Sequence, residues 1–202
     1  MKKYKALVLD MDGTIINSLD AVVGALEETA RAWRYPITDT HIDLARYSSG
    51  EALYNILELA DRDKALFMEE YGARYHENAR NNTLFPGISA LLSAPVPCGI
   101  VTNESRDELL QNLDRFGLVS RFQAFGCAGD TPFEKPHPRP LLYCLEQMKT
   151  APRDAIFVGD SRNDMLCAGA AGVDFGLALW GADPRETFED ALHVFKRPED
   201  IL

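Results

Sequence analysis

Residues 6–14 read ALVLDMDGT, an apolar run that ends in two acids, a glycine and a threonine. The run is almost continuously apolar rather than alternating, which is typical of a strand buried on both faces of a parallel sheet. Asp10 ends this strand, and Asp12 follows two residues later. Because ligands of open parallel sheets bind beyond the carboxyl ends of the strands, we expect both acids to face a ligand crevice.

Similar apolar runs recur along the chain, and helical patterns lie between them. The clearest helix begins with capping-box spacing at Ser105 and Glu108, presents one apolar face, and is followed by Gly117. Strands that alternate with helices predict a doubly wound, Rossmann-like α/β core. Strands are expected at residues 6–10, 98–102, 155–160 and 173–179, with a weaker one near 122–127, and helices at 105–116, 141–148 and 165–171.

Residues 18–82 follow a different pattern, with no convincing strand run. An all-helical insert of this size after the first strand predicts a small helical cap at residues 18–82. The α/β core would then consist of residues 1–17 and 83–202. Within the insert, helices are expected at residues 20–33, 51–59 and 64–79, with breaks near Pro36 and residues 48–50.

Composition limits the class of partner. Hydrophobic residues make up 46% of the chain, as in globular proteins, and the net charge of −10 disfavours nucleic acid and anionic membranes. No apolar run approaches the ~20 residues that span a bilayer. We therefore expect a cytoplasmic protein, monomer or homodimer, that binds neither nucleic acid nor membrane. Four scattered cysteines indicate free thiols in a reducing compartment: Cys98, Cys127, Cys144 and Cys167.

Polar residues end the later strands as well. Asp160 ends one of them, with Asp164 four residues on, and Thr102 ends another, while Lys135 lies in the loop FEKPHPRP. If Asp10, Asp160 and Asp164 converge, each like-charged pair at ~4 Å costs about 4 kcal/mol at an effective dielectric of ~20. The cluster therefore needs a cation, and an oxygen-only ligand set selects a hard ion, of which magnesium is the abundant one.

The sequence resembles the haloacid dehalogenase-like hydrolase superfamily, and it is most similar in pattern to phosphoglycolate phosphatase-like members with a small helical cap. The resemblance covers the whole chain, including the position of the cap. All four motifs of that family are present in order: DxDGT at residues 10–14, Thr102 followed by Asn103, Lys135-Pro136, and Asp160 with Asp164.

This resemblance implies a magnesium-dependent phosphatase that acts on a small phosphorylated metabolite, such as phosphoglycolate or a sugar phosphate. Asp10 would attack phosphorus to form an aspartyl phosphate. Asp12 would protonate the leaving alcohol and then deprotonate the hydrolytic water. Mg²⁺ would be held by the carboxylates of Asp10, Asp160 and Asp164 and by the backbone carbonyl of Asp12.

The resemblance also implies how the phosphate group is held. Thr102 and the adjacent amide of Asn103 would bind the phosphate oxygens, and Lys135 would neutralise charge on the nucleophile and the phosphate. Gly13 would give the loop the tight backbone angles that this binding site requires. In the cap, the predicted specificity residues are Arg46 and Ser49.

Other interpretations stay open. A sugar phosphomutase of the same superfamily shares every core motif. A haloacid dehalogenase is disfavoured because those relatives lack the second Asp, here Asp12. A signalling receiver domain is disfavoured because it has no helical insert, and a silent binding protein because every expected group is present. Taken singly, Asp164 also suits the first turn of a helix, while Lys135 and His137 also suit exposed loop positions.

Overall fold

The computed structural model describes residues 4–47 and 50–202, with the backbone alone described at residues 47 and 50–52. The chain divides into two compact units. One runs to Ile16 and resumes from Leu84 to Leu202, and the other runs from Asn17 to Thr83. The two linking segments, β2 (Ile16–Asn17) and β3 (Thr83–Leu84), pair with each other as a two-stranded sheet.

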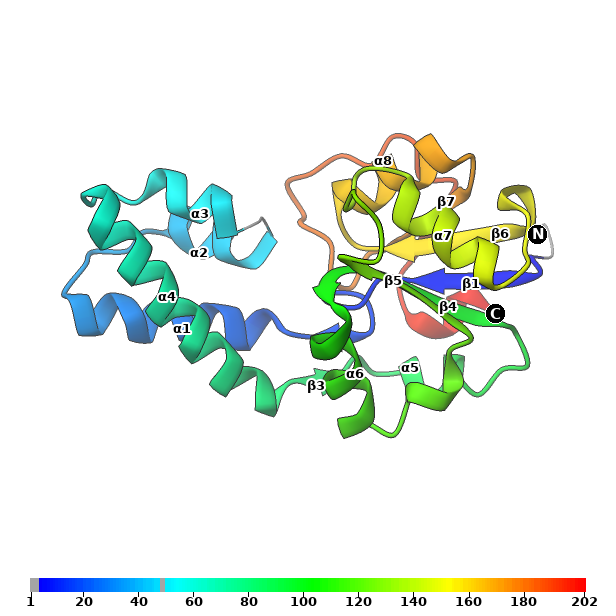
Figure 1. Cartoon of the computed structure of the whole chain (residues 1–202), viewed down its shortest axis with the longest axis horizontal. Helices are drawn as coiled ribbons and strands as arrows, with labels where there is room; N and C mark the ends of the chain where they lie inside the picture. Colours follow the sequence, from blue (N-terminus) through cyan, green and yellow to red (C-terminus); the bar gives the residue numbers. More distant parts are fainter. Residues whose placement is uncertain (1–3, 48–49) are drawn as a thin grey trace. The chain divides into compact units, whose positions relative to one another are not determined.

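The first unit is built on a six-stranded parallel sheet in the order β5-β4-β1-β6-β7-β8 (Figure 1). The chain runs outward from β1 to β4 and β5, and then continues on the other side of β1. This change of direction makes β1 the topological switch, where doubly wound folds bind ligands. The strands are β1 (Ala6–Leu9), β4 (Cys98–Ser105), β5 (Ala124–Ala128), β6 (Ala155–Gly159), β7 (Asp174–Ala178) and β8 (His193–Phe195).

Alternate side chains of the strands build one apolar layer on each face of the sheet. Leu7 and Leu9 of β1 pack into the first layer, and Ala6 and Val8 pack into the second. Because β1 is buried on both faces, its sequence is apolar at every position rather than at every second one. The first layer is covered by α5 (Ile88–Leu91) and α6 (Arg106–Arg115), and the second by α7 (Arg139–Gln147) and α8 (Arg162–Ala171).

The second unit is helical and has an apolar core of its own. Phe67 is fully buried there, and its ring centroid lies 5.7 Å from those of both Trp33 and Tyr35. The other buried members of this core are Leu26, Ala30, Ala45, Leu53 and Leu57. The helices are α1 (Leu19–Trp33), α2 (Asp39–Tyr47), α3 (Gly50–Ile56), α4 (Asp61–Asn78) and the short η1 (Ala79–Asn81).

The predicted α/β class is confirmed, and each predicted strand and helix is present with shifted ends. β4 continues past Thr102 to Ser105, and its register against β5 shifts between Val101 and Ser105. Such irregularities are common beside binding sites. The sequence analysis missed α2, α5, β8 and the two-residue strands β2 and β3. β8 has three residues, of which Val194 is exposed, so this edge strand carries little apolar signal.

Three further predictions concern a helix cap, the cysteines and membrane-spanning helices. The predicted capping box at Ser105 and Glu108 is present at the start of α6. All four cysteines are free and buried, as expected. In the described part of the chain, no helix combines the length and apolar character that crossing a bilayer requires. Short 3-10 helices complete the fold: η2 (Val119–Arg121), η3 (Pro152–Asp154) and η4 (Pro198–Ile201).

Phe67→Ala tests the core of the second unit. The substitution leaves a cavity beneath Trp33 and Tyr35, so the free energy of unfolding of this unit should fall by about 3–5 kcal/mol. Leu66→Ala, at the neighbouring position with 43% exposure, should change it by less than about 1 kcal/mol. The chain has two tryptophans, so a Trp180→Phe background leaves Trp33 as the one tryptophan that reports. Urea unfolding followed by Trp33 fluorescence then measures the stability of the second unit. Equal losses for the two variants would contradict this packing.

Candidate active site

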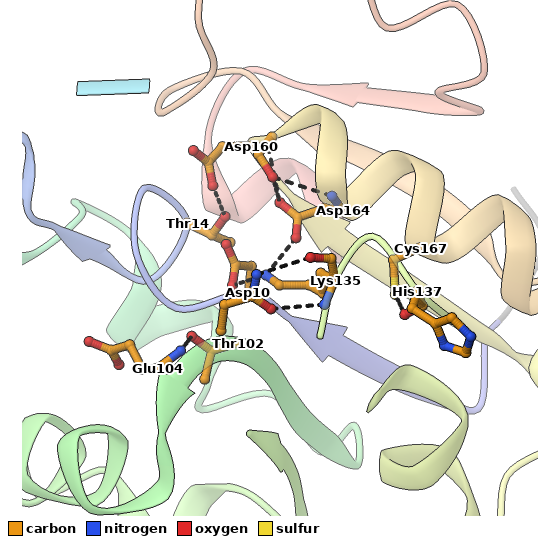
Figure 2. A network of polar contacts seen from close by, with 11 residues as sticks. Asp10, Thr14, Thr102, Glu104, Lys135, His137, Asp160, Asp164 and Cys167 are labelled. Atoms are coloured by element: carbon orange, nitrogen blue, oxygen red, sulfur yellow. Dashed lines mark hydrogen bonds and ion pairs between the residues drawn. The ribbon is translucent and has the colours of Figure 1, made fainter. Parts of the chain in front are cut away.

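The loop after β1 carries the first predicted acids. The N–H of Asp10 donates to the carbonyl of Val158 at 2.9 Å, which fixes the end of β1 against β6. The N–H groups of Ile15 and Ile16 both donate to the carbonyl of Met11, at 2.8 and 2.9 Å, and close a tight loop. The carboxylate of Asp10 therefore lies at the carboxyl edge of the sheet, at the topological switch (Figure 2).

Gly13 lies where this loop approaches two other segments. Its φ is +75°, and a Cβ there would overlap the carboxylate of Asp160. The hydroxyl of Thr14 donates to Oδ1 of the same carboxylate at 2.8 Å. From the loop after β7, the indole N–H of Trp180 donates to the Thr14 carbonyl at 3.0 Å, and a Cβ on Gly181 would overlap the Gly13 carbonyl. The loop is thus held between the ends of β6 and β7.

Lys135 lies at the centre of the polar network (Figure 2). Its Nζ donates to Oδ1 of Asp10 at 2.6 Å and to Oδ1 of Asp164 at 2.7 Å, and 5% of its side chain is exposed. Burial alone would lower the pKa of Lys135, but the two carboxylates outweigh burial and raise it. The ammonium therefore remains charged and joins the loop after β1 to α8.

Asp164 takes part in two interactions at once. One carboxylate oxygen pairs with Lys135, while the other accepts from the N–H of Ser161 at 3.0 Å and from its hydroxyl at 2.6 Å. The second set completes a capping box at the start of α8. The helix interpretation of this acid is confirmed, since it caps the first turn of α8, and the same side chain lies fully buried in the polar network.

Three carboxylates gather at this edge of the sheet. Oxygens of Asp10, Asp160 and Asp164 lie within 4.8 Å of one another. Burial, and then the charges of the neighbouring acids, raise the pKa of Asp10 from 3.8 to about 7 and that of Asp160 well above its ordinary value. Concentrated negative charge with oxygen-only donors fits a hard divalent cation such as Mg²⁺.

A pocket of about 280 Å³ opens at this cluster. The buried Thr102 faces it, and its hydroxyl accepts from the N–H of Glu104 at 3.1 Å. The carboxylate of Glu104 accepts from Asn112 Nδ2 at 3.1 Å, and burial followed by the charge of Asp12 raises the pKa of Glu104 to about 9. The residues that line the pocket are Asp10, Asp12, Thr102, Asn103, Glu104, Lys135, Ser161 and Asn163.

Of the predicted core residues, five line this pocket and the other three contact its acids or its lysine: Asp10, Asp12, Thr102, Asn103 and Lys135 line it, and Gly13, Asp160 and Asp164 lie beside them. The other candidates have different surroundings. Arg46 lies on α2 of the second unit with an exposed side chain. Ser49 lies outside the described residues. The ring of His137 stacks on Phe133 with centroids 4.0 Å apart, and its Nδ1 accepts from the N–H of Arg139 at 3.1 Å. His137 therefore helps to shape the loop that carries Lys135.

Some residues of the site were not predicted. Glu104 lies two positions after Thr102, near the carboxyl end of β4, and Trp180 and Gly181 lie two and three residues after the last residue of β7. Only their position could have indicated them: they lie at the carboxyl ends of strands that share one edge of the sheet. The acids, hydroxyl and lysine at such positions were predicted, whereas no residue after the 173–179 run was.

Comparisons with known proteins point to one family. The model of the haloacid dehalogenase-like hydrolases matches residues 7–178. The chain is 27% identical over 202 residues to pyrophosphatase PpaX of Bacillus pumilus, which covers 97% of the chain and 90% of the relative. It is 28% identical over 225 residues to the phosphoglycolate phosphatase of Mannheimia succiniciproducens, with coverage of 96% and 98%.

A solved structure agrees with these relatives. The crystal structure of a Lactobacillus plantarum protein inferred to be a phosphoglycolate phosphatase superposes with a TM-score of 0.86 at 34% sequence identity. The match covers 99% of this chain and 98% of that one. The similarity therefore extends through both units of the chain, in agreement with the family match.

Lys135→Met should destabilise the metal-free protein, and more so at higher pH. Because burial raises the pKa of Asp10 to about 7, the folded state holds an extra proton between roughly pH 4 and 7, and stability falls as pH rises through that window. The Lys135 ammonium lowers the pKa of Asp10, so removing the ammonium raises that pKa further. We expect a loss of about 3–5 kcal/mol at pH 8 and a smaller loss at pH 5.

Urea unfolding of the Lys135→Met variant in EDTA at both pH values measures this difference. Lys5→Met is the matched control, since Lys5 pairs with Asp154 at an exposed position, at 3.0 Å. The control should lose less than about 1 kcal/mol at both pH values. Equal losses for Lys135→Met at pH 5 and pH 8 would contradict the assignment of a buried charge cluster.

Gly181→Ala should destabilise the first unit. The added Cβ would overlap the Gly13 carbonyl, so the backbone must shift, at a cost of about 1–3 kcal/mol. Gly169→Ala is the control: no atom lies within 4 Å of a Cβ at this position in α8, so stability should rise by about 0.5–1 kcal/mol. Thermal unfolding followed by circular dichroism compares them, and a stabilised Gly181→Ala protein would show that the two loops do not touch.

Proposed function

The chain belongs to the haloacid dehalogenase-like hydrolase family, and from that assignment we propose that it is a magnesium-dependent phosphatase of small phosphate monoesters. The family match and the curated phosphatase relatives support hydrolysis of a phosphate ester. The observation that carries the proposal is the contact of Lys135 Nζ with Asp10 at 2.6 Å, beside two further carboxylates. The proposed nucleophile, a buried ammonium and the candidate metal donors thus lie within one polar network.

The reaction we propose has two steps. In the first, a carboxylate oxygen of Asp10 forms a bond to phosphorus while the bond from phosphorus to the leaving oxygen breaks. Asp12 gives its proton to that oxygen, so the leaving group departs as a neutral alcohol. In the second, Asp12 takes a proton from water, the water oxygen bonds to phosphorus, and the acyl phosphate bond breaks. Inorganic phosphate leaves, and Asp10 is regenerated.

Charge stabilisation is the main task in such a reaction, because the transferring phosphoryl group carries its charge on its equatorial oxygens. Lys135 is placed to neutralise charge on Asp10 and on the phosphoryl group. The hydroxyl of Thr102 and the backbone amide of Asn103 would donate to phosphoryl oxygens. Mg²⁺, held by the three carboxylates and by the Asp12 carbonyl, would supply a further positive charge that stabilises the transition state.

The substrate class follows from the relatives rather than from the pocket. The relatives named above act, by their names, on pyrophosphate and phosphoglycolate, so these two compounds and sugar phosphates are the first substrates to test. We propose no nucleic-acid or membrane partner. The assignment of residues 18–82 as a cap, with Arg46 and Ser49 as specificity residues, stays a prediction, as do the cytoplasmic location and the choice between monomer and homodimer.

Asp10→Asn should abolish phosphate release. The amide keeps the shape of the side chain but lacks a nucleophilic oxyanion, so turnover should fall by about a thousandfold or more. Release of inorganic phosphate from phosphoglycolate, pyrophosphate and sugar phosphates, with MgCl₂ or with EDTA, measures the effect. The EDTA-treated parent protein should be inactive and should recover when Mg²⁺ is returned.

Asp114→Asn, an exposed acid on α6, is the matched control and should keep parental turnover. Substantial activity of Asp10→Asn would end the assignment of the nucleophile. Conversion of a sugar phosphate to an isomer without release of phosphate would favour the phosphomutase alternative instead.

A further inference from the structure

The side chain of Asn103 binds the backbone of Lys135 at two points. Its Oδ1 accepts from the Lys135 N–H at 2.9 Å, and its Nδ2 donates to the Lys135 carbonyl at 3.1 Å. Asn103 lies near the carboxyl end of β4, whereas Lys135 lies in the loop after the neighbouring strand β5. One primary amide therefore satisfies both backbone groups of a single residue in that loop, an arrangement that fixes position and orientation together.

This contact uses the polar atoms of the Asn103 side chain that a phosphate ligand would need. The amide nitrogen is the only donor atom of the side chain and carries two N–H bonds, one of which is directed at the Lys135 carbonyl. Only the second N–H is left for a phosphate oxygen, and the two bonds to Lys135 fix the direction in which it points. The side chain of Asn103 is therefore committed mainly to the loop of Lys135, whereas its backbone amide is the part that we expect to donate to a phosphate oxygen.

The position of Lys135 matters because its ammonium spans two carboxylates. Nζ reaches Asp10 at 2.6 Å and Asp164 at 2.7 Å, from a side chain that is 5% exposed. On the far side of the lysine loop, the thiol of Cys167 donates to the carbonyl of His137 at 3.3 Å (Figure 2). The Asn103 side chain holds the loop at Lys135 itself, the residue that carries the ammonium.

A second contact joins the start of α6, directly after β4, to the loop after β5 without touching Lys135. The guanidinium of Arg106 donates to both oxygens of Asp130, from Nε at 3.1 Å and from Nη2 at 2.6 Å, and Asp130 also accepts from the Cys127 N–H at 2.8 Å. Loss of the Asn103 amide should therefore leave the loops adjacent and the fold intact. Its effect should be confined to the placement of Lys135.

We propose that Asn103 is a positioning residue whose side-chain amide holds the Lys135 backbone so that the ammonium stays between Asp10 and Asp164. The contribution to turnover rests on the proposed phosphatase function, whereas the contribution to loop order does not. Misplacing a charge-stabilising group by about 1 Å can cost on the order of a hundredfold in rate. The amide thus acts on catalysis through the lysine and not through the phosphate.

Hydrogen exchange tests the positioning without requiring activity. In Asn103→Ala, peptides that cover residues 131–139 should exchange at least about tenfold faster, because the Lys135 N–H loses its acceptor. Asn103→Asp keeps an acceptor oxygen and should retain more of this protection. Gln111→Ala, which removes an exposed amide on α6, should leave the exchange of these peptides unchanged. Parental exchange rates in Asn103→Ala would overturn the proposal.

Kinetics then tests the route by which Asn103 acts. Asn103→Ala should lower kcat by about ten- to a hundredfold and change KM little. In a Lys135→Met background, the same substitution should lower turnover no further, because the group that it positions is gone. A full additional loss in that background would assign the amide to the phosphate directly and overturn the proposal. A parent protein that releases no phosphate would reject the proposed function, and the exchange experiment would still decide the role of Asn103.

Discussion

The buried ammonium of Lys135 lies between Asp10 and Asp164, 2.6 and 2.7 Å from their oxygens, and the arrangement of the site depends on this pair of contacts. Three carboxylates within 4.8 Å of one another repel strongly in a buried setting. The Lys135 ammonium offsets part of this repulsion and also fixes which carboxylate oxygens of Asp10 and Asp164 face it. Burial, together with the remaining negative charge, raises the pKa of Asp10 to about 7. The site is thus arranged to accept additional positive charge.

Parallel strands explain how residues so distant in sequence come to share this charge. The loops after β1, β4, β5 and β6 leave the sheet at the same edge, and the switch of direction at β1 opens that edge to a ligand. Close backbone approaches then fix the loops against one another. Gly13 leaves room for the Asp160 carboxylate on one side and meets Gly181 on the other, so backbone atoms help to position the loop that carries Asp10.

The buried acids that would serve the reaction also lower the free energy of unfolding of the protein. Unmatched buried acids destabilise a fold as they ionise, since the unfolded chain hydrates them fully. A protein optimised for stability alone would place apolar side chains at Asp10 and Asp160. Here the cost is limited by bonds that satisfy the remaining oxygens, from Thr14 to Asp160 and from Ser161 to Asp164. The buried carboxylates lower the stability of the fold locally, and these bonds keep them oriented before a ligand binds.

The sequence by itself determined the α/β class, the strands that carry the site, and the identity of the acids, hydroxyl and lysine, because burial on two faces and strand-ending polar residues leave a local pattern. Only the tertiary structure decided the partners. It paired Lys135 with Asp164 as well as Asp10, placed Glu104 against Asp12, and turned the Asn103 side chain toward a backbone. Such contacts join loops far apart in the chain, and their geometry depends on how each loop packs, which no local pattern records. The weak elements were missed for a related reason: β8 is held by its neighbour β7 rather than by the pattern of its own residues.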